Sequence, residues 1–336
     1  MNFKKWSWIG AAFLLLVAAL FLFFKTSPPP PKKLPNPNGY DDLVKAAGMF
    51  IGDLPECFWS QSLEGECVEA TKGYLNTNSE ALKLARVGLS REGRIPIVFT
   101  KAYFIQHIPE LALMKRLAQT LNAEGKVAEK DNRTNDAIQN YVDAALIHDK
   151  MRGGVMIDAL VGIACEAIGV GSLRKLADQM TMSQRKNLIE KLSRMHANRD
   201  PLDEILWREK QFVKVYGPKE QLTYFVMFRS RRILERSLER KLKYAQTRLG
   251  LFLVDLSLRN FESENKVSPK TLQELVSKYI PLLPKDDFSG NDFIYRPSTN
   301  GYEIYSVGPD GKDDGGKPFL KRGTDSPGDM LPNAQY

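Results

Sequence analysis

Cysteine and histidine are scarce in this chain, with three of each among 336 residues. Three cysteines are too few for a disulfide-stapled scaffold or a cysteine-rich zinc protein. The histidines, His107, His148 and His196, leave little material for a histidine-based metal or acid–base site. The patterns HExxH, GxSxG and CxxC and the phosphate-binding loop pattern are all absent. The sequence therefore names no reaction, and we expect a protein that is not an enzyme.

The overall composition is that of a folded protein. Apolar residues make up 43% of the chain and charged residues 26%, which excludes the collagen-like, fibrous and wholly disordered classes. The length allows about two globular domains with accessory segments.

The net charge of +8 is concentrated in two segments. Residues 1–40 hold five lysines and no acid, and residues 229–243 hold seven basic residues against two glutamates. A nucleic-acid-binding surface would need clustered basic residues with aromatic residues or a known module. We therefore expect no nucleic acid as a partner. We interpret the basic residues as the flanks of a membrane span and as a solvated or partner-facing helix surface.

An apolar run without charge occupies residues 6–24, WSWIGAAFLLLVAALFLFF. At about 1.5 Å per residue, a helix of this length spans a hydrocarbon core of about 30 Å. Trp6 and Trp8 stand where interfacial aromatic residues belong, and lysines flank both ends. The run thus predicts a transmembrane anchor behind a short flank, residues 1–5. A cleaved signal peptide is the alternative, but bulky phenylalanines stand where a cleavage site needs small residues.

Residues 25–39 read as a proline-rich linker, with six prolines between Thr26 and Asn38. An extended polyproline segment rises about 3.1 Å per residue, so it would hold the body about 40 Å from the membrane. A peptide ligand for an SH3-like groove is the alternative interpretation. Because lysines flank both sides of the span, the positive-inside rule does not determine its orientation. Because the N-terminal flank is short, we expect a single-pass protein of a bacterial inner membrane with its body in the periplasm.

Helical periodicity dominates residues 40–218. Asn78 and Ser79 predict the start of a helix that continues EALKLARVGL. Gly125 predicts the end of another. The small residues Gly162 and Ala164 would let a neighbouring helix approach closely. Further helices are expected at 108–122, 136–150, 153–180, 183–196 and 202–213.

The segment 123–150, AEGKVAEKDNRTNDAIQNYVDAALIHDK, resembles a tetratricopeptide-type helical hairpin, although no repeat at a fixed period is visible. A helical-hairpin array of this kind binds partners on a concave face. An irregular bundle, whose helix faces only pack on one another, is the other interpretation, and both stay open.

The cysteines divide into a pair and a single residue. Cys57 and Cys67 are separated by nine residues and could form a disulfide in an oxidising compartment. They could equally be two small buried apolar groups. Cys165 lies in the most apolar helix and is expected in the core. His107 and His148 have no companion at metal-ligand spacing, so we expect structural or surface roles for both.

A long helix is expected over residues 219–262, which contain no proline. Its apolar residues recur at steps of three or four and form a stripe, Leu234, Leu238, Leu242, Ala245, Leu249, Phe252 and Leu256. A short helix is predicted from Lys270 to Tyr279. Two short strands, 293–295 and 302–305, are predicted around the turn PSTNG.

The run LPKDDFSGNDFIYRPSTNGYEIYSVGPDGKDDGG, residues 283–316, resembles the C-terminal domain of the type II secretion major pseudopilins. In that family a proline-lysine-aspartate turn leads into a tyrosine-rich hairpin and a glycine-aspartate loop. The matching pieces are Pro284-Lys285-Asp286, Gly290-Asn291, Ile294-Tyr295-Arg296, Tyr305-Ser306-Val307-Gly308 and Asp310-Gly311. The resemblance covers about 244–316 and implies a small α+β domain after a long helix. A pseudopilin has its apolar helix directly under this domain, whereas here the anchor lies some two hundred residues away.

The resemblance also implies calcium, because the family binds the ion in its final loop through a backbone carbonyl and aspartates. The carbonyl position matches Val307 and the first aspartate matches Asp310, while Asp313 and Asp314 lie close by. A glycine-rich turn with three carboxylates suits a hard cation. A solvated acidic turn held by Asp/Gly turn chemistry is the alternative.

We therefore expect a mainly α protein: an N-terminal transmembrane helix, an α-helical hairpin array or bundle (40–218), and a long helix leading into a small α+β pseudopilin-like domain (219–318). Residues 319–336 read as a disordered tail. The expected function is that of a non-enzymatic interaction or scaffold protein. A genuine type II secretion or pseudopilus component is the first alternative. An enzyme whose site is assembled within the helical domain is the second.

Overall fold

The structure is a computed structural model that describes residues 33–59, 63–215, 228–298, 301–318 and 327–332. The predicted anchor at 6–24 lies outside the described residues, as do the beginning of the linker, residues 219–227 of the long helix and most of the tail. The described residues from Leu34 onward belong to one compact unit.

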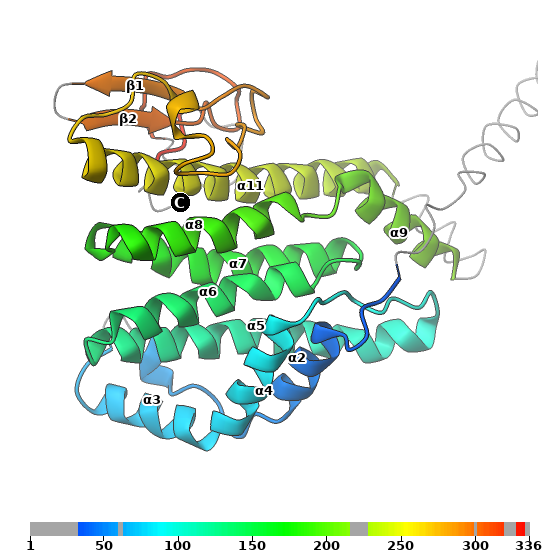
Figure 1. Cartoon of the computed structure of the whole chain (residues 1–336). Helices are drawn as coiled ribbons and strands as arrows, with labels where there is room; N and C mark the ends of the chain where they lie inside the picture. The colour runs from blue at the N-terminus through cyan, green and yellow to red at the C-terminus, as the bar shows by residue number, and fades with distance from the viewer. Residues whose placement is uncertain (1–32, 60–62, 216–227, 299–300, 319–326, 333–336) are drawn as a thin grey trace, which may run out of the picture. The chain divides into compact units, whose positions relative to one another are not determined.

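The described part of the chain is mainly helical, with one small antiparallel sheet near its C-terminal end (Figure 1). The α-helices are α2 (Gly39–Gly48), α3 (Glu66–Thr77), α4 (Ser79–Ser90), α5 (Lys101–Lys130), α6 (Thr134–Lys150), α7 (Met156–Leu176), α8 (Met182–Ala197), α9 (Leu202–Lys214) and α11 (Phe228–Asn265). The 3-10 helices are η1 (Glu56–Trp59), η2 (Ala177–Gln179) and η3 (Leu272–Leu275), and the strands are β1 (Ile294–Ser298) and β2 (Gly301–Tyr305). The mainly α class is therefore confirmed.

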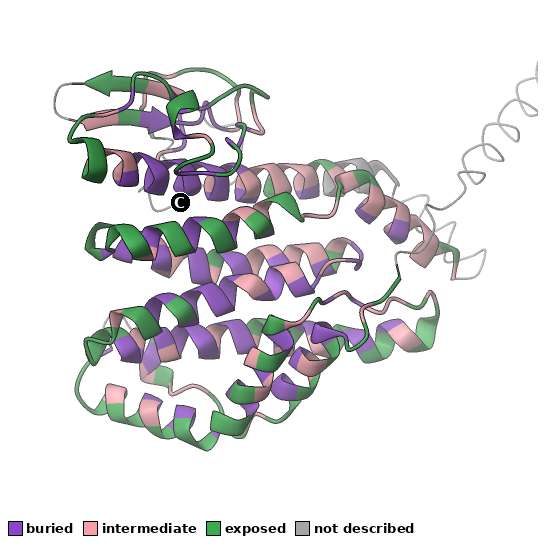
Figure 2. Cartoon of the chain, in the orientation of Figure 1, coloured by how far each residue is buried: buried purple, intermediate pink, exposed green. Residues whose placement is uncertain are grey.

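Helices α5, α6, α7, α8 and α11 lie side by side in a stack, with α2–α4 below it and the β-hairpin above it in Figure 1. Buried residues occur along each of these helices (Figure 2). Buried apolar residues form two clusters. One joins α2–α5 with parts of α6 and α7, and the other joins α6–α8 with α11 and the hairpin. The second cluster spans position 218, so the C-terminal module shares its core with the helices before it.

Asn78 stands at the predicted boundary, and α4 begins at Ser79. Its side chain does not cap the helix but accepts from the N–H of Ile51 (2.7 Å) and donates to the carbonyls of Ile51 (3.1 Å) and Tyr74 (2.9 Å). Asn78 is 2% exposed, and its side-chain amide thus joins the end of α3 to the segment around Ile51.

The predicted helix end at Gly125 is wrong, because α5 continues to Lys130. A Cβ on Gly125 would lie 2.4 Å from a ring carbon of Tyr141 on α6. This glycine therefore allows the close approach of the two helices. A glycine inside a helix costs less than about 1 kcal/mol relative to alanine.

Helix α7 is the central helix of the stack, and it begins at Met156, three residues later than predicted. The Asp158 side chain accepts from the N–H of Val155 (2.6 Å) and fixes this start. The predicted close approach is confirmed at Gly162, where a Cβ would lie 2.9 Å from the His148 ring. Within the described residues, Met156–Gln179 is the one segment long and apolar enough to cross a membrane, by length and composition only. A core helix satisfies the same two criteria, and α7 contacts α5, α6 and α11.

The predicted helix from Lys270 to Tyr279 is reduced to the single turn η3. Ser277 adopts a left-handed φ of 72°, and its N–H donates to the carbonyl of Ile280 (2.9 Å). The chain therefore turns back at Ser277, and a longer helix cannot continue through it. The predicted stripe of α11 is buried where its side chains are described, apart from the partly buried Leu242.

The predicted hairpin is present, with β1 and β2 antiparallel and Ser298 opposite Gly301. Residues 299–300 connect them and lie outside the described residues. Pro297 pairs with Tyr302. A strand proline is tolerated where its missing N–H would point to an open edge, which is the position it has here.

Candidate functional site

The imidazole of His107 on α5 lies between two carboxylates. Its Nε2 is 2.6 Å from Oδ1 of Asp158 on α7, and its Nδ1 is 2.8 Å from Oε2 of Glu110. The Tyr103 ring stacks on it at 5.1 Å, and the Tyr40 hydroxyl donates to Glu110 (3.1 Å). Burial lowers the pKa of His107, but the hydrogen bonds that its ring makes to Asp158 and Glu110 outweigh this effect, so the pKa is raised overall. Both ring nitrogens are engaged, and this centre joins α2, α5 and α7.

A second buried centre lies two turns further along α7, at Glu166. One of its oxygens is 2.5 Å from Nδ1 of His148 on α6, and Nη2 of Arg199 donates to both oxygens at 2.7 Å. Burial raises the pKa of Glu166, but Arg199 and His148 lower it more strongly, to about 2. The carboxylate is therefore ionised and fully paired, and it holds α6, α7 and the α8–α9 connection together.

An open groove of about 670 Å³ lies between α11, β2 and the last described residues. Its floor is a paired set in which the Asp255 carboxylate, 3% exposed, accepts from the Tyr302 hydroxyl (2.9 Å) and from Arg259 Nε (2.8 Å). Its walls are Glu303, Ile304, Tyr305, Gly315, Gly316, Leu331 and Pro332. The volume lies in the range of ligand-binding clefts, about 300–1,000 Å³.

This groove runs along the open edge of β2. The N–H and C=O of Ser306 bond to Met330 (3.0 and 2.9 Å), so they face away from β1. Backbone groups alternate along a strand, so those of Tyr302 and Ile304 face the same way. Neither residue has a backbone partner on this side among the described residues. The register places Pro332 opposite Ile304, and proline has no N–H to donate.

The predicted calcium-binding residues lie in the turns beside this groove. Asp313 accepts from the Tyr305 hydroxyl and the N–H of Gly315, both at 2.9 Å, and these bonds lower its pKa. Asp314 accepts from the N–H of Gly328 (2.7 Å), and Asp310 from that of Lys312 (3.2 Å). Val307 is buried, and its N–H donates to Asp286 (3.1 Å).

Each of these three aspartates thus already accepts a hydrogen bond from the chain itself. In the described part of the chain, no group of three or more His, Cys, Asp or Glu is arranged to hold a metal ion. The residues as placed therefore do not form a convergent ligand set, and the calcium site stays a prediction.

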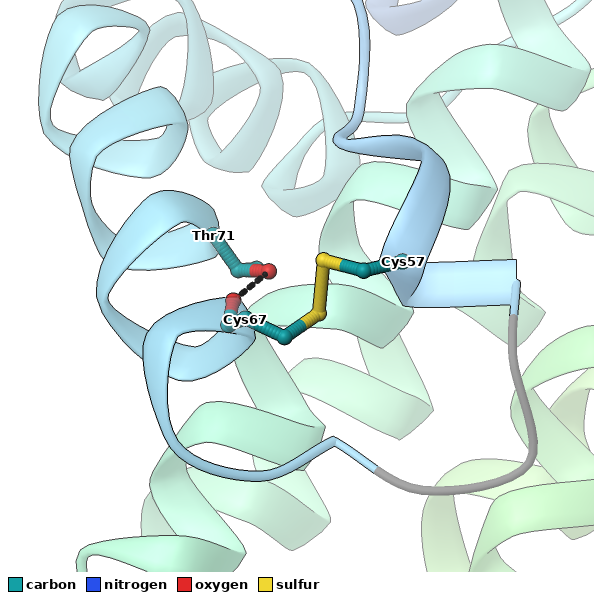
Figure 3. The surroundings of a disulfide bond; sticks show 3 residues. All are labelled: Cys57, Cys67 and Thr71. Carbon is teal, nitrogen blue, oxygen red and sulfur yellow. Dashed lines mark hydrogen bonds between the residues drawn. A yellow bond between two sulfur atoms is a disulfide. The ribbon is translucent and has the colours of Figure 1, made fainter.

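Cys57 on η1 and Cys67 on α3 are joined by a disulfide, with an S–S distance of 2.10 Å (Figure 3). It joins the first turn of α3 to the preceding 3-10 helix, where the Thr71 hydroxyl also donates to the Cys67 carbonyl (2.8 Å). Cys165 is a buried free thiol, and burial raises its pKa to about 12. The thiol is therefore protonated and unreactive at neutral pH.

Thiol trapping in cells tests the disulfide and the location of the body together. In acid-quenched, denatured protein we expect one alkylated cysteine, Cys165, without reductant and three after reduction. A Cys165→Ala variant should show none without reductant. Three alkylated cysteines before reduction would contradict both the bond and an oxidising location.

No protein-family model, curated protein or solved structure matches this chain. The resemblances to pseudopilins and to tetratricopeptide hairpins therefore stay predictions.

The pairing of the two histidines with buried acids was not predicted from the sequence. One feature of the sequence does indicate it: Asp158 and Glu166 stand eight residues apart in the most apolar helix of the body. Buried carboxylates need partners, and the spacing places both on one face of a helix. The partners, His107, His148 and Arg199, are distant in sequence, so only the fold brings them to these acids.

Proposed function

We propose that this chain is a single-pass, membrane-anchored, non-enzymatic interaction protein that binds an extended segment of a partner protein along the open edge of β2. One observation carries the proposal. The backbone groups of Tyr302 and Ile304 lack partners in the described structure, and they face a groove of about 670 Å³.

An open strand edge binds extended peptides by adding them as a further strand. Main-chain hydrogen bonds supply affinity, and side-chain pockets supply specificity. The edge here offers two residues, Tyr302 and Ile304, before the chain's own segment at Met330 occupies the position beside Ser306. So short an edge suits a segment of three or four residues and a transient contact.

The two edges of the hairpin differ: a proline protects the edge of β1, whereas the edge of β2 is open. On β1, Pro297 occupies an outward-facing position and removes a donor, which protects that edge. On the β2 side, Pro332 lacks the N–H that an antiparallel neighbour of Ile304 would donate. Gly315 and Gly316 line the groove without side chains, which leaves room for an incoming backbone.

The proposed location is the periplasmic side of a bacterial inner membrane, with residues 6–24 as the anchor. The apolar run and its flanking lysines support the anchor. The disulfide between Cys57 and Cys67 supports an oxidising compartment.

Two further proposals follow from the pseudopilin resemblance. The first is that Val307, Asp310, Asp313 and Asp314 take up calcium after exchanging their present hydrogen bonds. Millimolar calcium should then raise the melting temperature of the wild type and not that of Asp310→Ala, and equal melting temperatures would contradict it. The second is that the chain works within a type II secretion or pseudopilus assembly, where an edge-binding module would contact another subunit.

Site-specific crosslinking in living cells tests the proposed function. A photo-reactive residue replaces Glu303, which lines the groove and has a 69% exposed side chain. We expect a discrete crosslinked partner. Its crosslinked peptide should map to one extended segment.

Two matched glycine variants provide the control. Gly315 and Gly290 both have a φ of +74°, and neither has an atom within 4 Å of the Cβ position. Asparagine tolerates this backbone region, so neither substitution should unfold the module. Gly315→Asn places a side chain in the groove and should lower the crosslink yield about tenfold, a difference of about 1.4 kcal/mol. Gly290→Asn, outside the groove, should leave it unchanged. Equal yields in both variants would overturn the proposal.

A further inference from the structure

The first three turns of α5 carry an apolar outer face. Their buried side chains point into the body, where Phe104 packs on Phe212 of α9 and His107 is hydrogen-bonded to Asp158 of α7. The opposite side of the helix is exposed, and it consists of Ala102, Ile105, Ile108, Pro109 and Ala112. Surface helices normally place charged and polar residues on this side. Exposed apolar residues gathered on one helix face therefore mark an interaction surface.

The side chains of this face are large and carry no negative charge. Ile105 and Ile108 are 75% and 51% exposed, and Val98, just before the helix, is 52% exposed. Residues 95–109 contain one lysine, Lys101, and no arginine, aspartate or glutamate. Such a face fits a lipid surface, where apolar side chains enter the region between headgroups and acyl chains.

The chain enters the body beside this face. The Asn38 side chain accepts from the N–H of Arg94 (3.0 Å) and donates to its carbonyl (2.9 Å). The Tyr40 ring lies 6.3 Å from that of His107, and its hydroxyl donates to Glu110, the first acid of α5 (3.1 Å). In Figure 1 the first described residues and the start of α5 lie at the same end of the stack. The apolar face is therefore close to the point where the chain arrives from the predicted anchor.

The connection between that anchor and the body is short. Eight residues, 25–32, separate the apolar run from Lys33, where the described chain begins. A chain of eight residues reaches at most about 29 Å when fully extended. A tether of this length keeps the body at a high effective concentration beside the bilayer, so that even a weak lipid contact is populated.

We infer that the outer face of α5, around Ile105 and Ile108, docks on the surface of the lipid bilayer that holds this chain's own anchor. The inference rests on the proposed anchor at residues 6–24. Helix α5 belongs to the part of the stack next to α2–α4, whereas the β-hairpin stands at the other side (Figure 1). Docking through α5 therefore leaves the groove along β2 open to a partner segment.

Quenching by brominated lipids tests this docking in the full chain. The protein is reconstituted in vesicles of phosphatidylethanolamine and phosphatidylglycerol with brominated acyl chains. A bimane label is attached to Ile105→Cys, Leu282→Cys or Leu15→Cys in a Cys165→Ala background, where the native disulfide does not react. Ile105 and Leu282 are each 75% exposed, so Leu282 is a matched control in the C-terminal module. Relative to vesicles without bromine, we expect at least about twofold quenching at Ile105 and at Leu15 and none at Leu282.

The three labels separate a failure of the docking from a failure of the anchor. Quenching at Leu15 without quenching at Ile105 would overturn the docking and leave the anchor intact. An unquenched label at Leu15 would overturn the proposed anchor and the docking with it. A label at Ile105 that is shielded from aqueous iodide but not quenched by lipid would show that protein covers this face, which also overturns the inference. Equal quenching at Ile105 and Leu282 would contradict a specific face.

Discussion

Replacing Glu166 with glutamine is expected to lower the free energy of unfolding by about 3–5 kcal/mol. The side chain keeps its shape but loses its charge, which leaves Arg199 buried without its ion-pair partner beside His148. Breaking one member of a buried ion pair costs more than the pair contributes, because the remaining charge stays desolvated. Denaturant unfolding of the purified chain measures the difference.

The control for this variant is Glu190→Gln. Glu190 pairs with Arg194 one turn apart on α8, with side chains 61% and 74% exposed. Solvent screens this pair, so the expected loss is below about 0.5 kcal/mol. Equal losses in the two variants would contradict the assignment of Glu166 as a buried centre.

The same carboxylate sets an acid limit on stability. Its pKa falls from 4.5 to about 2 on folding. An acid whose pKa is lower in the folded state contributes its full stabilisation at a pH above its unfolded-state pKa. This stabilisation is lost as the pH falls toward the folded-state pKa. The stability difference between the wild type and Glu166→Gln should therefore shrink between pH 4.5 and about 2. A difference that stays constant over this interval would show that the ionised carboxylate does not supply it.

Replacing Gly169 with alanine is expected to destabilise the chain by about 2 kcal/mol or more. A Cβ there would lie 2.2 Å from the Tyr141 carbonyl oxygen and 2.6 Å from the Ala145 nitrogen. Both are backbone atoms of α6, so they cannot rotate away, and α6 and α7 must separate. The melting temperature and the denaturant midpoint measure the loss.

Gly171→Ala on the same helix is the matched control. No atom lies within 4 Å of its Cβ position. Alanine there removes the glycine penalty of a helix interior, so a gain of about 0.5–1 kcal/mol is expected. A loss of stability in Gly169→Ala together with a gain in Gly171→Ala would indicate that α6 and α7 pack closely at Gly169. Destabilisation by both variants would indicate a general intolerance of α7 instead.

Local patterns in the sequence predicted most elements of this fold. The α4 boundary at Asn78–Ser79, the stripe of α11 and the β1–β2 hairpin all depend on residues close together in the chain. The errors at Gly125 and at Lys270–Tyr279 have tertiary causes. A neighbouring ring made glycine necessary inside α5, and the fold of the chain onto itself at Ser277 ended η3.

The candidate sites were less accessible to prediction, because they depend on contacts between distant segments. The partners of Asp158 and Glu166 come from α5, α6 and the α8–α9 connection, and no spacing rule links them. The open edge of β2 also depends on where Met330 pairs, some twenty-five residues beyond the hairpin. A pattern of strands predicts a hairpin but does not predict which of its edges stays open.

Amide hydrogen exchange at single-residue resolution in β2 tests the central claim most directly. In the purified full chain, the N–H groups of Glu303 and Tyr305 face β1, and those of Tyr302 and Ile304 face the groove. We expect slow exchange at Glu303 and Tyr305 and fast exchange at Tyr302 and Ile304, because an amide without an acceptor is not protected. Slow exchange at all four amides would show that the chain already closes this edge, and the proposed binding of a partner segment there would be wrong.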